Sequence, residues 1–169
     1  AVETLGSTSV ICSDKTGTLT RDEMTARRFF VAGHFVDVSG AGYTPEGQFT
    51  RDGAATPRSA VLDELLQAAA LASDARLVHD AANRTWHVQG DPTEGALVVA
   101  AAKAGWHKHE LDARFARVHE IPFDAQTRRM TTLHATPAGV VAHAKGAPEV
   151  VLADCAWQRT ADGVRPLDD

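Results

Sequence analysis

Asp14 and Lys15 open a short polar string, Asp14-Lys15-Thr16-Gly17-Thr18-Leu19-Thr20, that follows an apolar run. The apolar run, Val10–Cys12, is predicted to be a short buried strand, so Asp14 would stand at its carboxyl end. Open α/β sheets bind ligands at that edge, and a carboxylate placed there can attack a phosphoryl group and form an aspartyl phosphate. Lys15 and the loop amides would offset the charge of the phosphate. A polar loop with an Asx turn explains the same residues without a ligand, so spacing alone leaves both interpretations open.

Three later strings carry side chains of the kinds that bind a nucleotide: Gly90-Asp91-Pro92-Thr93-Glu94-Gly95-Ala96-Leu97, Pro122-Phe123-Asp124 with Arg128-Arg129-Met130, and Lys145-Gly146-Ala147-Pro148-Glu149. Each also has a plainer explanation. Glu94 lies three residues after Asp91 and would complete a capping box at the start of a helix without any ligand. Phe123 follows a proline and would fit a hydrophobic core. Lys145 would fit the end of a strand as an ordinary lysine.

Taken together and in this order, the strings resemble P-type ATPases, the ion pumps that cycle through an aspartyl phosphate. Asp14 to Thr20 is similar to the phosphorylation signature of that family, and Val2 to Ser9 resembles the link from the membrane to the phosphorylation domain. The three later strings resemble motifs of the nucleotide-binding domain. Gly42-Tyr43-Thr44-Pro45-Glu46-Gly47 resembles a segment of calcium-pump-like members, so calcium is the leading expectation for the transported ion.

The resemblance implies a role for each matching residue. Asp14 would be the catalytic nucleophile, with Lys15 and Thr16 beside it, and Mg²⁺ would be held by the Asp14 carboxylate and the Thr16 backbone carbonyl. Glu94 would accept a hydrogen bond from the adenine amino group, and Phe123 would stack on the ring. The other nucleotide-binding positions are Thr93, Arg128, Met130, Lys145, at the rear of the purine pocket, and Gly146. The expected cofactors are therefore ATP and Mg²⁺.

Three positions depart from the pattern of the family or of its relatives. Arg128 stands where the family commonly has a lysine, and the two cations differ in donor geometry, which affects its phosphate contact. Arg129 is the neighbouring alternative. Ala125 stands where the family often has a basic residue, so one phosphate-side contact is expected to be missing. Related phosphatases carry an acid–base Asp at the position of Thr16, and its absence would slow hydrolysis and let a phosphoenzyme persist.

The elements that must position these residues form an irregular alternation of strands and helices, which predicts an α/β or α+β fold. Helices are expected over Ser59–Ser73, with Ser59 as its cap, over Asp91–Ala104, closed by Gly105, and shortly after Gly146. Gly40–Gly53 is expected to be a loop. Strands are expected over Met24–Val31, His34–Val38, Arg76–His79, Thr85–Val88, Phe115–Ile121, Arg129–Ala135 and Val140–Lys145.

Composition excludes several classes of function. The 169 residues hold 17 basic and 22 acidic side chains, and a net charge of −5 argues against a nucleic-acid binder or an anionic-membrane binder. The longest strictly apolar run, Ala96–Ala102, is seven residues long, whereas a membrane-spanning helix needs about 20. Composition alone therefore predicts a cytosolic chain. The resemblance implies that it is a soluble cytoplasmic piece of an integral membrane pump, which does not itself contact the membrane.

The resemblance also predicts the domain organisation. Residues 1–24 would be a phosphorylation-domain segment, contributing one strand and loop of a Rossmann-like domain. Residues 25–169 would be a nucleotide-binding domain with a mainly antiparallel sheet flanked by helices. The return segments of the phosphorylation domain, with further catalytic residues, would follow residue 169, so the chain alone would bind ATP with little turnover. Its partners would be the remaining phosphorylation, actuator and membrane domains. A self-standing aspartyl-phosphate phosphatase and a non-catalytic adenine-nucleotide-binding module remain as alternatives.

Overall fold

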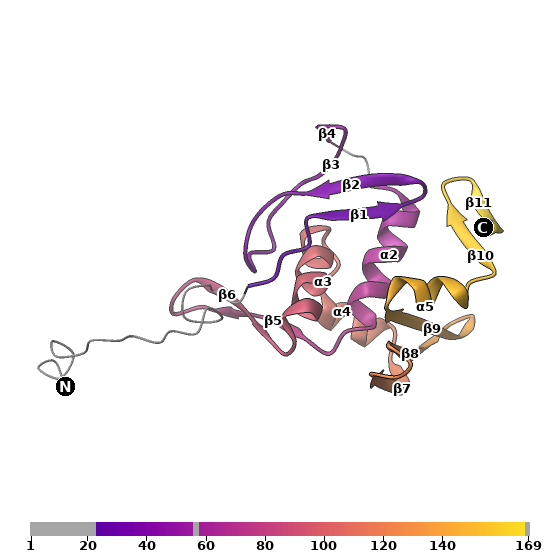
Figure 1. Ribbon diagram of the computed structural model, residues 1–169. Helices are drawn as coiled ribbons and strands as arrows, with labels where there is room; N and C mark the ends of the chain where they lie inside the picture. Colours follow the sequence, from indigo (N-terminus) through magenta and orange to yellow (C-terminus); the bar gives the residue numbers. More distant parts are fainter. Residues whose placement is uncertain (1–22, 56–57, 168–169) are drawn as a thin grey trace, which may run out of the picture.

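The computed structural model describes residues 23–55 and 58–167, and these form an α+β fold with antiparallel strands (Figure 1). In this part of the chain the strands form four sheets, with the orders β1-β2-β3-β4, β5-β6, β7-β8-β9 and β10-β11. The helices are α2 (Ala60–Leu71), α3 (Pro92–Lys103), α4 (Lys108–Arg114) and α5 (Pro148–Ala153). The strands are β1 (Arg28–Val31), β2 (His34–Val38), β3 (Phe49–Arg51), β4 (Ala54–Ala55), β5 (Arg76–Asp80), β6 (Thr85–Gln89), β7 (Arg117–Asp124), β8 (Arg129–Thr136), β9 (Gly139–Gly146), β10 (Trp157–Thr160) and β11 (Gly163–Pro166). The predicted antiparallel architecture with flanking helices is confirmed; the expected strand at Val10–Cys12 lies outside the described residues.

Helices α2 and α3 begin where their capping residues predict. The Ser59 hydroxyl accepts the Leu62 N–H, and the Asp91 carboxylate accepts the N–H groups of Thr93 and Glu94. These side chains satisfy backbone donors that lack a partner in the first turn of a helix. The two bonds at Asp91, the first from Glu94, hold the pKa of its carboxyl below the ordinary value.

The hydrophobic core lies where α2 packs against α3 and α4. Leu66 of α2 is completely buried, and Leu111 is the buried residue of α4. Burying one such leucine stabilises the fold by about 1.5–3 kcal/mol relative to leaving it in water. The remaining core residues lie on β2, α2 and α3 and at the C-cap of α3: Val36, Leu62, Ala70, Leu71, Ala100, Ala101 and Ala104.

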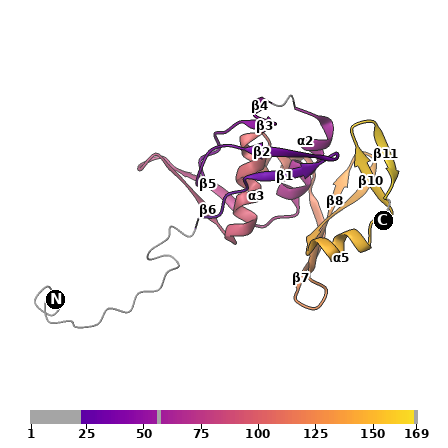
Figure 2. The same ribbon diagram turned by 45° about the horizontal axis from the view of Figure 1, so that its top comes forward.

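The three-stranded sheet β7-β8-β9 stands beside this helical core. Along β8, Met130, Thr132 and His134 are buried, while the residues between them are only partly covered. This alternation means that one face of the sheet is turned inward. Helix α5 and the β10–β11 hairpin lie beside the same sheet (Figures 1 and 2). The predicted β8–β9 hairpin is confirmed, with Thr136 paired to Gly139 at its turn.

Three sequence predictions of local structure are wrong. The segment expected to be a loop, Gly40–Gly53, contains strand β3, which pairs with β2. The first expected strand, Met24–Val31, begins only at Arg28. The strand expected over Phe115–Ile121 begins at Arg117, because Phe115 closes the short helix α4. Over residues 23–55 and 58–167, no helix has the length and apolar character that crossing a bilayer requires.

Candidate nucleotide-binding site

An ion pair between Glu94 and Lys145 joins two of the predicted site residues. Glu94 lies in the first turn of α3 and Lys145 near the end of β9, so the pair connects a helix to the three-stranded sheet. The Lys145 ammonium donates to Oε1 of Glu94 and also to the Ser73 hydroxyl, at 3.4 Å. The side chains are 26% exposed for Lys145 and 16% for Glu94. Solvent therefore reaches the pair without surrounding it.

The second carboxylate oxygen of Glu94 accepts two backbone hydrogen bonds. The Asp74 N–H lies 2.7 Å from Oε2 and the Ala75 N–H lies 3.0 Å from it. The predicted capping box is therefore only half formed: Asp91 caps the helix, but the Glu94 carboxylate reaches the segment after α2 instead of returning to the Asp91 backbone. An ionised carboxylate has about four acceptor positions, so Glu94 keeps room for a further donor.

Strand pairing places Met130 next to Lys145, and Phe123 one strand further away. Met130 of β8 is paired with Lys145 of β9 and is buried. Across β7 and β8, Ile121 pairs with Thr131 and Asp124 pairs with Arg129, so two residues of β7, Pro122 and Phe123, lie opposite Met130 alone. Such a β-bulge bends the strand and redirects its side chains. Phe123 is 62% exposed, which excludes the expectation that it is simply a core residue.

Arg128 occupies the turn between β7 and β8. Its φ of +49° is a left-handed conformation that few residues other than glycine adopt. Its guanidinium lies 2.6 Å from a carboxylate oxygen of Glu149 on α5, and the neighbouring Arg129 pairs with Asp154. Both predicted phosphate-side cations are thus held by acidic groups of α5 and its C-terminal cap.

Gly146 lies directly against the Arg128 turn. A Cβ atom at this position would be 2.7 Å from Cβ of Arg129 and under 3.0 Å from the Arg128 carbonyl oxygen. That carbonyl oxygen accepts the Ala147 N–H at 3.0 Å. Glycine is therefore required for β9 to end this close to the turn.

Thr93 is adjacent to Glu94 in the first turn of α3. Its hydroxyl lies 3.5 Å from the sulfur of Met24, in the segment that leads to β1. The seven residues predicted to contact nucleotide lie on α3, β7, β8 and β9 and on the turn between β7 and β8.

Arg117 is a residue that the sequence interpretation missed. One of its nitrogens contacts the carboxylates of Asp74 and Glu120, at 2.6 and 2.8 Å, and the other lies 3.0 Å from two backbone carbonyl oxygens, those of Leu71 and Ser73. Burial opposes its charge, but the bonds to the two carboxylates outweigh that effect and raise the pKa of Arg117 above its ordinary value. An isolated arginine in a strand gives no sequence signal for such a role.

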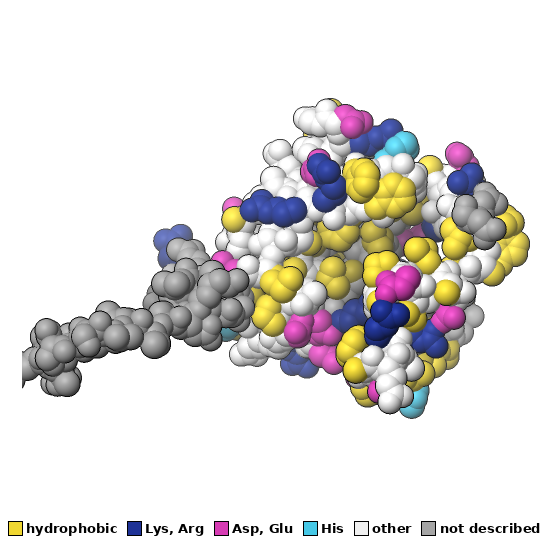
Figure 3. All heavy atoms as spheres, viewed as in Figure 1, with side chains coloured by type: hydrophobic (Ala, Val, Ile, Leu, Met, Phe, Trp, Pro, Cys, Tyr) yellow, Lys and Arg dark blue, Asp and Glu magenta, His cyan; other side chains and the backbone are white. Residues whose placement is uncertain are grey.

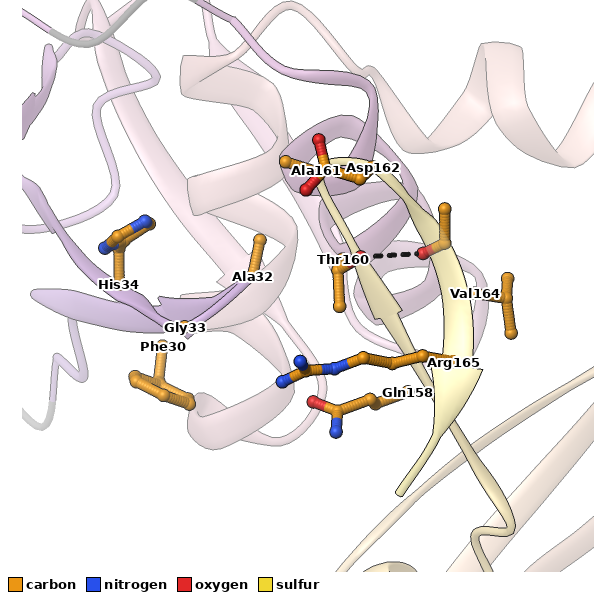
Figure 4. Close-up of a pocket in the computed structure, with 11 residues that line it drawn as sticks. Phe30, Ala32, Gly33, His34, Gln158, Thr160, Ala161, Asp162, Val164 and Arg165 are labelled. Atoms are coloured by element: carbon orange, nitrogen blue, oxygen red, sulfur yellow. Dashed lines mark hydrogen bonds between the residues drawn. The ribbon is translucent and has the colours of Figure 1, made fainter. Parts of the chain in front are cut away.

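A separate cleft of about 580 Å³ lies between the β1–β2 and β10–β11 hairpins. Phe30 and His34 line one side, and Gln158 and Arg165 line the other, with the Arg165 side chain directed toward Phe30 (Figure 4). Hydrophobic side chains gather on the face of the molecule where these hairpins and α5 meet (Figure 3). None of the predicted nucleotide-binding residues lines this cleft.

The three predicted phosphorylation residues, Asp14, Lys15 and Thr16, lie outside the described residues, as does the Mg²⁺ site expected at Asp14 and Thr16. Within the described ranges, no group of three or more His, Cys, Asp and Glu side chains is placed to hold a metal ion. The candidate site holds an aromatic side chain, a carboxylate and cations, at Phe123, Glu94, Lys145 and Arg128.

Comparison with known proteins agrees with the family suggested by the motifs. The family model for the P-type ATPase cytoplasmic domain N matches residues 61–169, more than half of the chain. A probable cation-transporting ATPase F of Mycobacterium tuberculosis is 44% identical over 99% of this chain and 19% of its own length. The cation-transporting ATPase pma1 of Synechocystis is 40% identical, covering 96% of this chain and 18% of that protein. A calcium-transporting ATPase of Bacillus subtilis is 36% identical, covering 90% of this chain and 17% of that protein.

The chain thus spans about one fifth of the length of these relatives or less. The family model places domain N on the part of the chain that holds Glu94, Phe123 and Lys145. By this match, the chain belongs to the P-type ATPase family and contains its cytoplasmic domain N.

Proposed function

We propose that the described site binds the nucleotide of ATP, with the adenine ring against Phe123. The observation that carries this proposal is a line of neighbours: Phe123 lies opposite Met130 on the next strand, Met130 is paired with Lys145, and the Lys145 ammonium contacts Glu94. Four elements contribute to that line, although the residues are far apart in the sequence. Pockets for flat ligands combine an apolar surface with a few fixed polar groups, and this line supplies both.

Each residue has a chemical role in the proposed complex. Phe123 offers an exposed ring for stacking, which requires no base-specific hydrogen bond. Glu94 uses its remaining acceptor capacity for the adenine amino group. Lys145 and the glycine backbone at Gly146 line the rear of the ring, and Met130 fills the space beneath it. Thr93, next to Glu94, borders the same edge.

Arg128 is proposed to contact phosphate once it leaves Glu149. Their ion pair is exposed on both sides, 51% for Arg128 and 62% for Glu149. Pairs as exposed as this contribute little free energy. A nucleotide phosphate can therefore replace the Glu149 carboxylate at low cost, and the fork of the guanidinium suits phosphate oxygens.

In a full-length pump of the kind formed by the relatives, we propose that Asp14 accepts the γ-phosphate of MgATP. A carboxylate oxygen of Asp14 bonds to the γ-phosphorus, the bond to the β,γ-bridging oxygen breaks, and ADP leaves with that electron pair. Lys15 would offset phosphate charge, and Mg²⁺, held by Asp14 and the Thr16 carbonyl, would neutralise developing charge. The isolated chain is expected to bind nucleotide with little turnover.

The transported ion and the partner domains follow from the relatives by analogy. One relative, from Bacillus subtilis, is named a calcium-transporting ATPase, and others are named only as cation-transporting. We propose a cation as the transported ion, with calcium as the first to test. The phosphorylation, actuator and membrane domains of such a pump would be the partners of this domain.

A titration of the ¹⁵N-labelled chain with MgATP tests the nucleotide proposal. Amide shifts are expected to saturate and to centre on Glu94, Phe123 and Lys145, with inorganic phosphate alone giving no such pattern. Shifts centred instead on Phe30 and Arg165, at the other cleft, would contradict the site.

Two further assays separate the alternatives. Release of phosphate from aryl phosphates by the isolated chain would favour a self-standing phosphatase. Radiolabelled phosphate on Asp14 in a full-length pump that contains this chain, lost in Asp14→Asn, would exclude a non-catalytic nucleotide-binding module. Strong autophosphorylation of the isolated chain would contradict the expected low turnover.

A further inference from the structure

Arg117 contacts the backbone and a side chain at the end of helix α2. The last carbonyl groups of an α-helix have no partner inside the helix and need one outside it. One guanidinium nitrogen of Arg117 donates to the carbonyl oxygens of Leu71 and Ser73, at 3.0 Å each. The other contacts the Asp74 carboxylate at 2.6 Å. One side chain therefore contacts three residues within the four-residue segment 71–74 that leaves the helix.

That same segment supplies the two backbone donors that hold Glu94. Directly after the carbonyl of Ser73, the N–H groups of Asp74 and Ala75 point at Oε2 of Glu94, at 2.7 and 3.0 Å. Ala75 is completely buried and lies against the backbone of Gly90. The Ser73 carbonyl and the Asp74 N–H belong to one planar peptide group, so when the carbonyl oxygen points at Arg117 the N–H points the other way, at Glu94. The Ala75 N–H belongs to the next peptide group and follows directly in the chain.

We infer that Arg117 is a positioning residue for the nucleotide site: by fixing residues 71–74, it sets the orientation of the Glu94 carboxylate, and thereby of Lys145. This inference rests on the proposed nucleotide function and adds to it a residue outside the ligand-contacting set. Arg117 touches neither Glu94 nor Lys145 directly. Its effect passes through the backbone between α2 and β5.

The geometry explains why an arginine is needed. The guanidinium fork presents several N–H groups in a fixed plane, whereas a lysine ammonium is a point charge on a flexible stem. Arg117 uses two of its nitrogens for four acceptors, and its side chain is only 23% exposed. A lysine would keep the charge and lose the simultaneous contacts.

Lys108 provides a matched control. Its ammonium also caps the end of α2, at the carbonyl oxygen of Ala70, 3.3 Å away, and it pairs with Asp112. No bond joins Lys108 to Ser73, Asp74 or Ala75 among the described contacts. Lys108→Met therefore weakens the same helix end without releasing the donors to Glu94.

The test compares the unaltered 169-residue chain with Arg117→Met, Arg117→Lys and Lys108→Met, each confirmed as folded by its amide spectrum. For Arg117→Met, hydrogen exchange at the Asp74 and Ala75 amides is expected to accelerate by about tenfold, and the Kd for MgATP to rise by about tenfold, since a charged hydrogen-bonding partner is lost. For Arg117→Lys, the exchange rates and the Kd are expected to lie between those of the unaltered chain and those of Arg117→Met. Lys108→Met is expected to lower the thermal stability. It should leave the slow hydrogen exchange at the Asp74 and Ala75 amides and the affinity for MgATP unchanged.

Two results would overturn the inference. One is an Arg117→Met chain that binds MgATP as tightly as the unaltered chain. The other is a Lys108→Met chain that loses affinity by the same factor as Arg117→Met, because the effect would then be general destabilisation. If MgATP causes no amide shifts in the unaltered chain, the proposed nucleotide function is refuted, and the inference with it.

Discussion

Lys145 and Glu94 are separated by 51 positions in the sequence, and their side chains form an ion pair that ties β9 to the first turn of α3. Neither residue is fully buried or fully exposed. Fully exposed pairs contribute little, and fully buried pairs lose most of their attraction to desolvation. The Glu94–Lys145 pair, 16% and 26% exposed, lies between these two extremes. In the proposed complex a ligand would reach it from the surface without first opening the core.

Replacing Glu94 by alanine is expected to destabilise the fold as well as the ligand complex. The change leaves the N–H groups of Asp74 and Ala75 without their acceptor and Lys145 without its partner. Leaving a buried donor unsatisfied costs about 1–3 kcal/mol, and the free energy of unfolding in urea should fall by that amount. Glu149→Ala, which removes only an exposed pair with Arg128, is the control and should change stability far less.

Replacing Phe123 by alanine is expected to affect binding and not stability. If the ring stacks on adenine, affinity for MgATP should weaken by about 1–3 kcal/mol. Phe30→Ala is a matched control, because Phe30 is 64% exposed against 62% for Phe123 but lies in β1. Equal affinities for the two variants, measured by calorimetry, would remove Phe123 from the site.

Adding a methyl group at Gly146 is expected to disturb the Arg128 turn. The new Cβ would press on the Arg128 carbonyl and on Cβ of Arg129, 2.7 Å away. Overpacking of this kind costs about 1–3 kcal/mol of stability, and Gly146→Ala should also weaken nucleotide binding.

Gly139→Ala is the comparison for that variant. At Gly139 no atom lies within 4 Å of an added Cβ, and only the φ of +124° opposes it. Some stability should be lost in Gly139→Ala without any loss of affinity. If both variants bind MgATP equally well, the close approach of Gly146 to the turn has no part in recognition.

Acid is expected to destabilise the domain through His143. Burial, and secondarily the neighbouring His134, lower the pKa of His143 below its ordinary 6.5. The ring lines a cavity with Glu64 and Gln67 of α2 and with His134 of β8. The unfolded chain therefore binds a proton more readily than the folded one, so stability falls as the pH drops below about 6.5 toward the folded-state pKa.

The measurement for His143 is the urea midpoint at pH 7.5 and at pH 5. In His143→Gln, the difference between the urea midpoints at the two pH values should be smaller. His109→Gln, at a position 81% exposed on α4, is the control and should leave the difference unchanged. A pH dependence that survives His143→Gln in full would show that another group is responsible.

The parts of the fold that sequence predicts are those in which local signals agree with the tertiary structure. Ser59 and Asp91 mark the starts of α2 and α3, and the Thr136–Gly139 turn marks a hairpin. Helix α4 has no such signal: it is a polar seven-residue segment with one buried residue, Leu111, and its cap residue makes no side-chain bond. It is helical because Leu111 packs against the core.

The residues of the candidate site could be proposed from the sequence, but their contacts could not. Motif order identified Glu94, Phe123 and Lys145, because each lies in a string of recognisable spacing. Spacing could not show that Glu94 bonds to the segment after α2, since a capping box uses the same residue type at the same position. Arg117 gave no signal because its partners are brought to it only by folding.

The most direct test of the account is an intermolecular nuclear Overhauser measurement on the chain saturated with MgATP. The adenine H2 and H8 protons are expected to give cross-peaks to the Phe123 ring and to the Lys145 side-chain methylenes. Cross-peaks to Phe30, or to Trp86 of β6, with none to Phe123, would contradict the claim that the line from Phe123 to Glu94 is the nucleotide site.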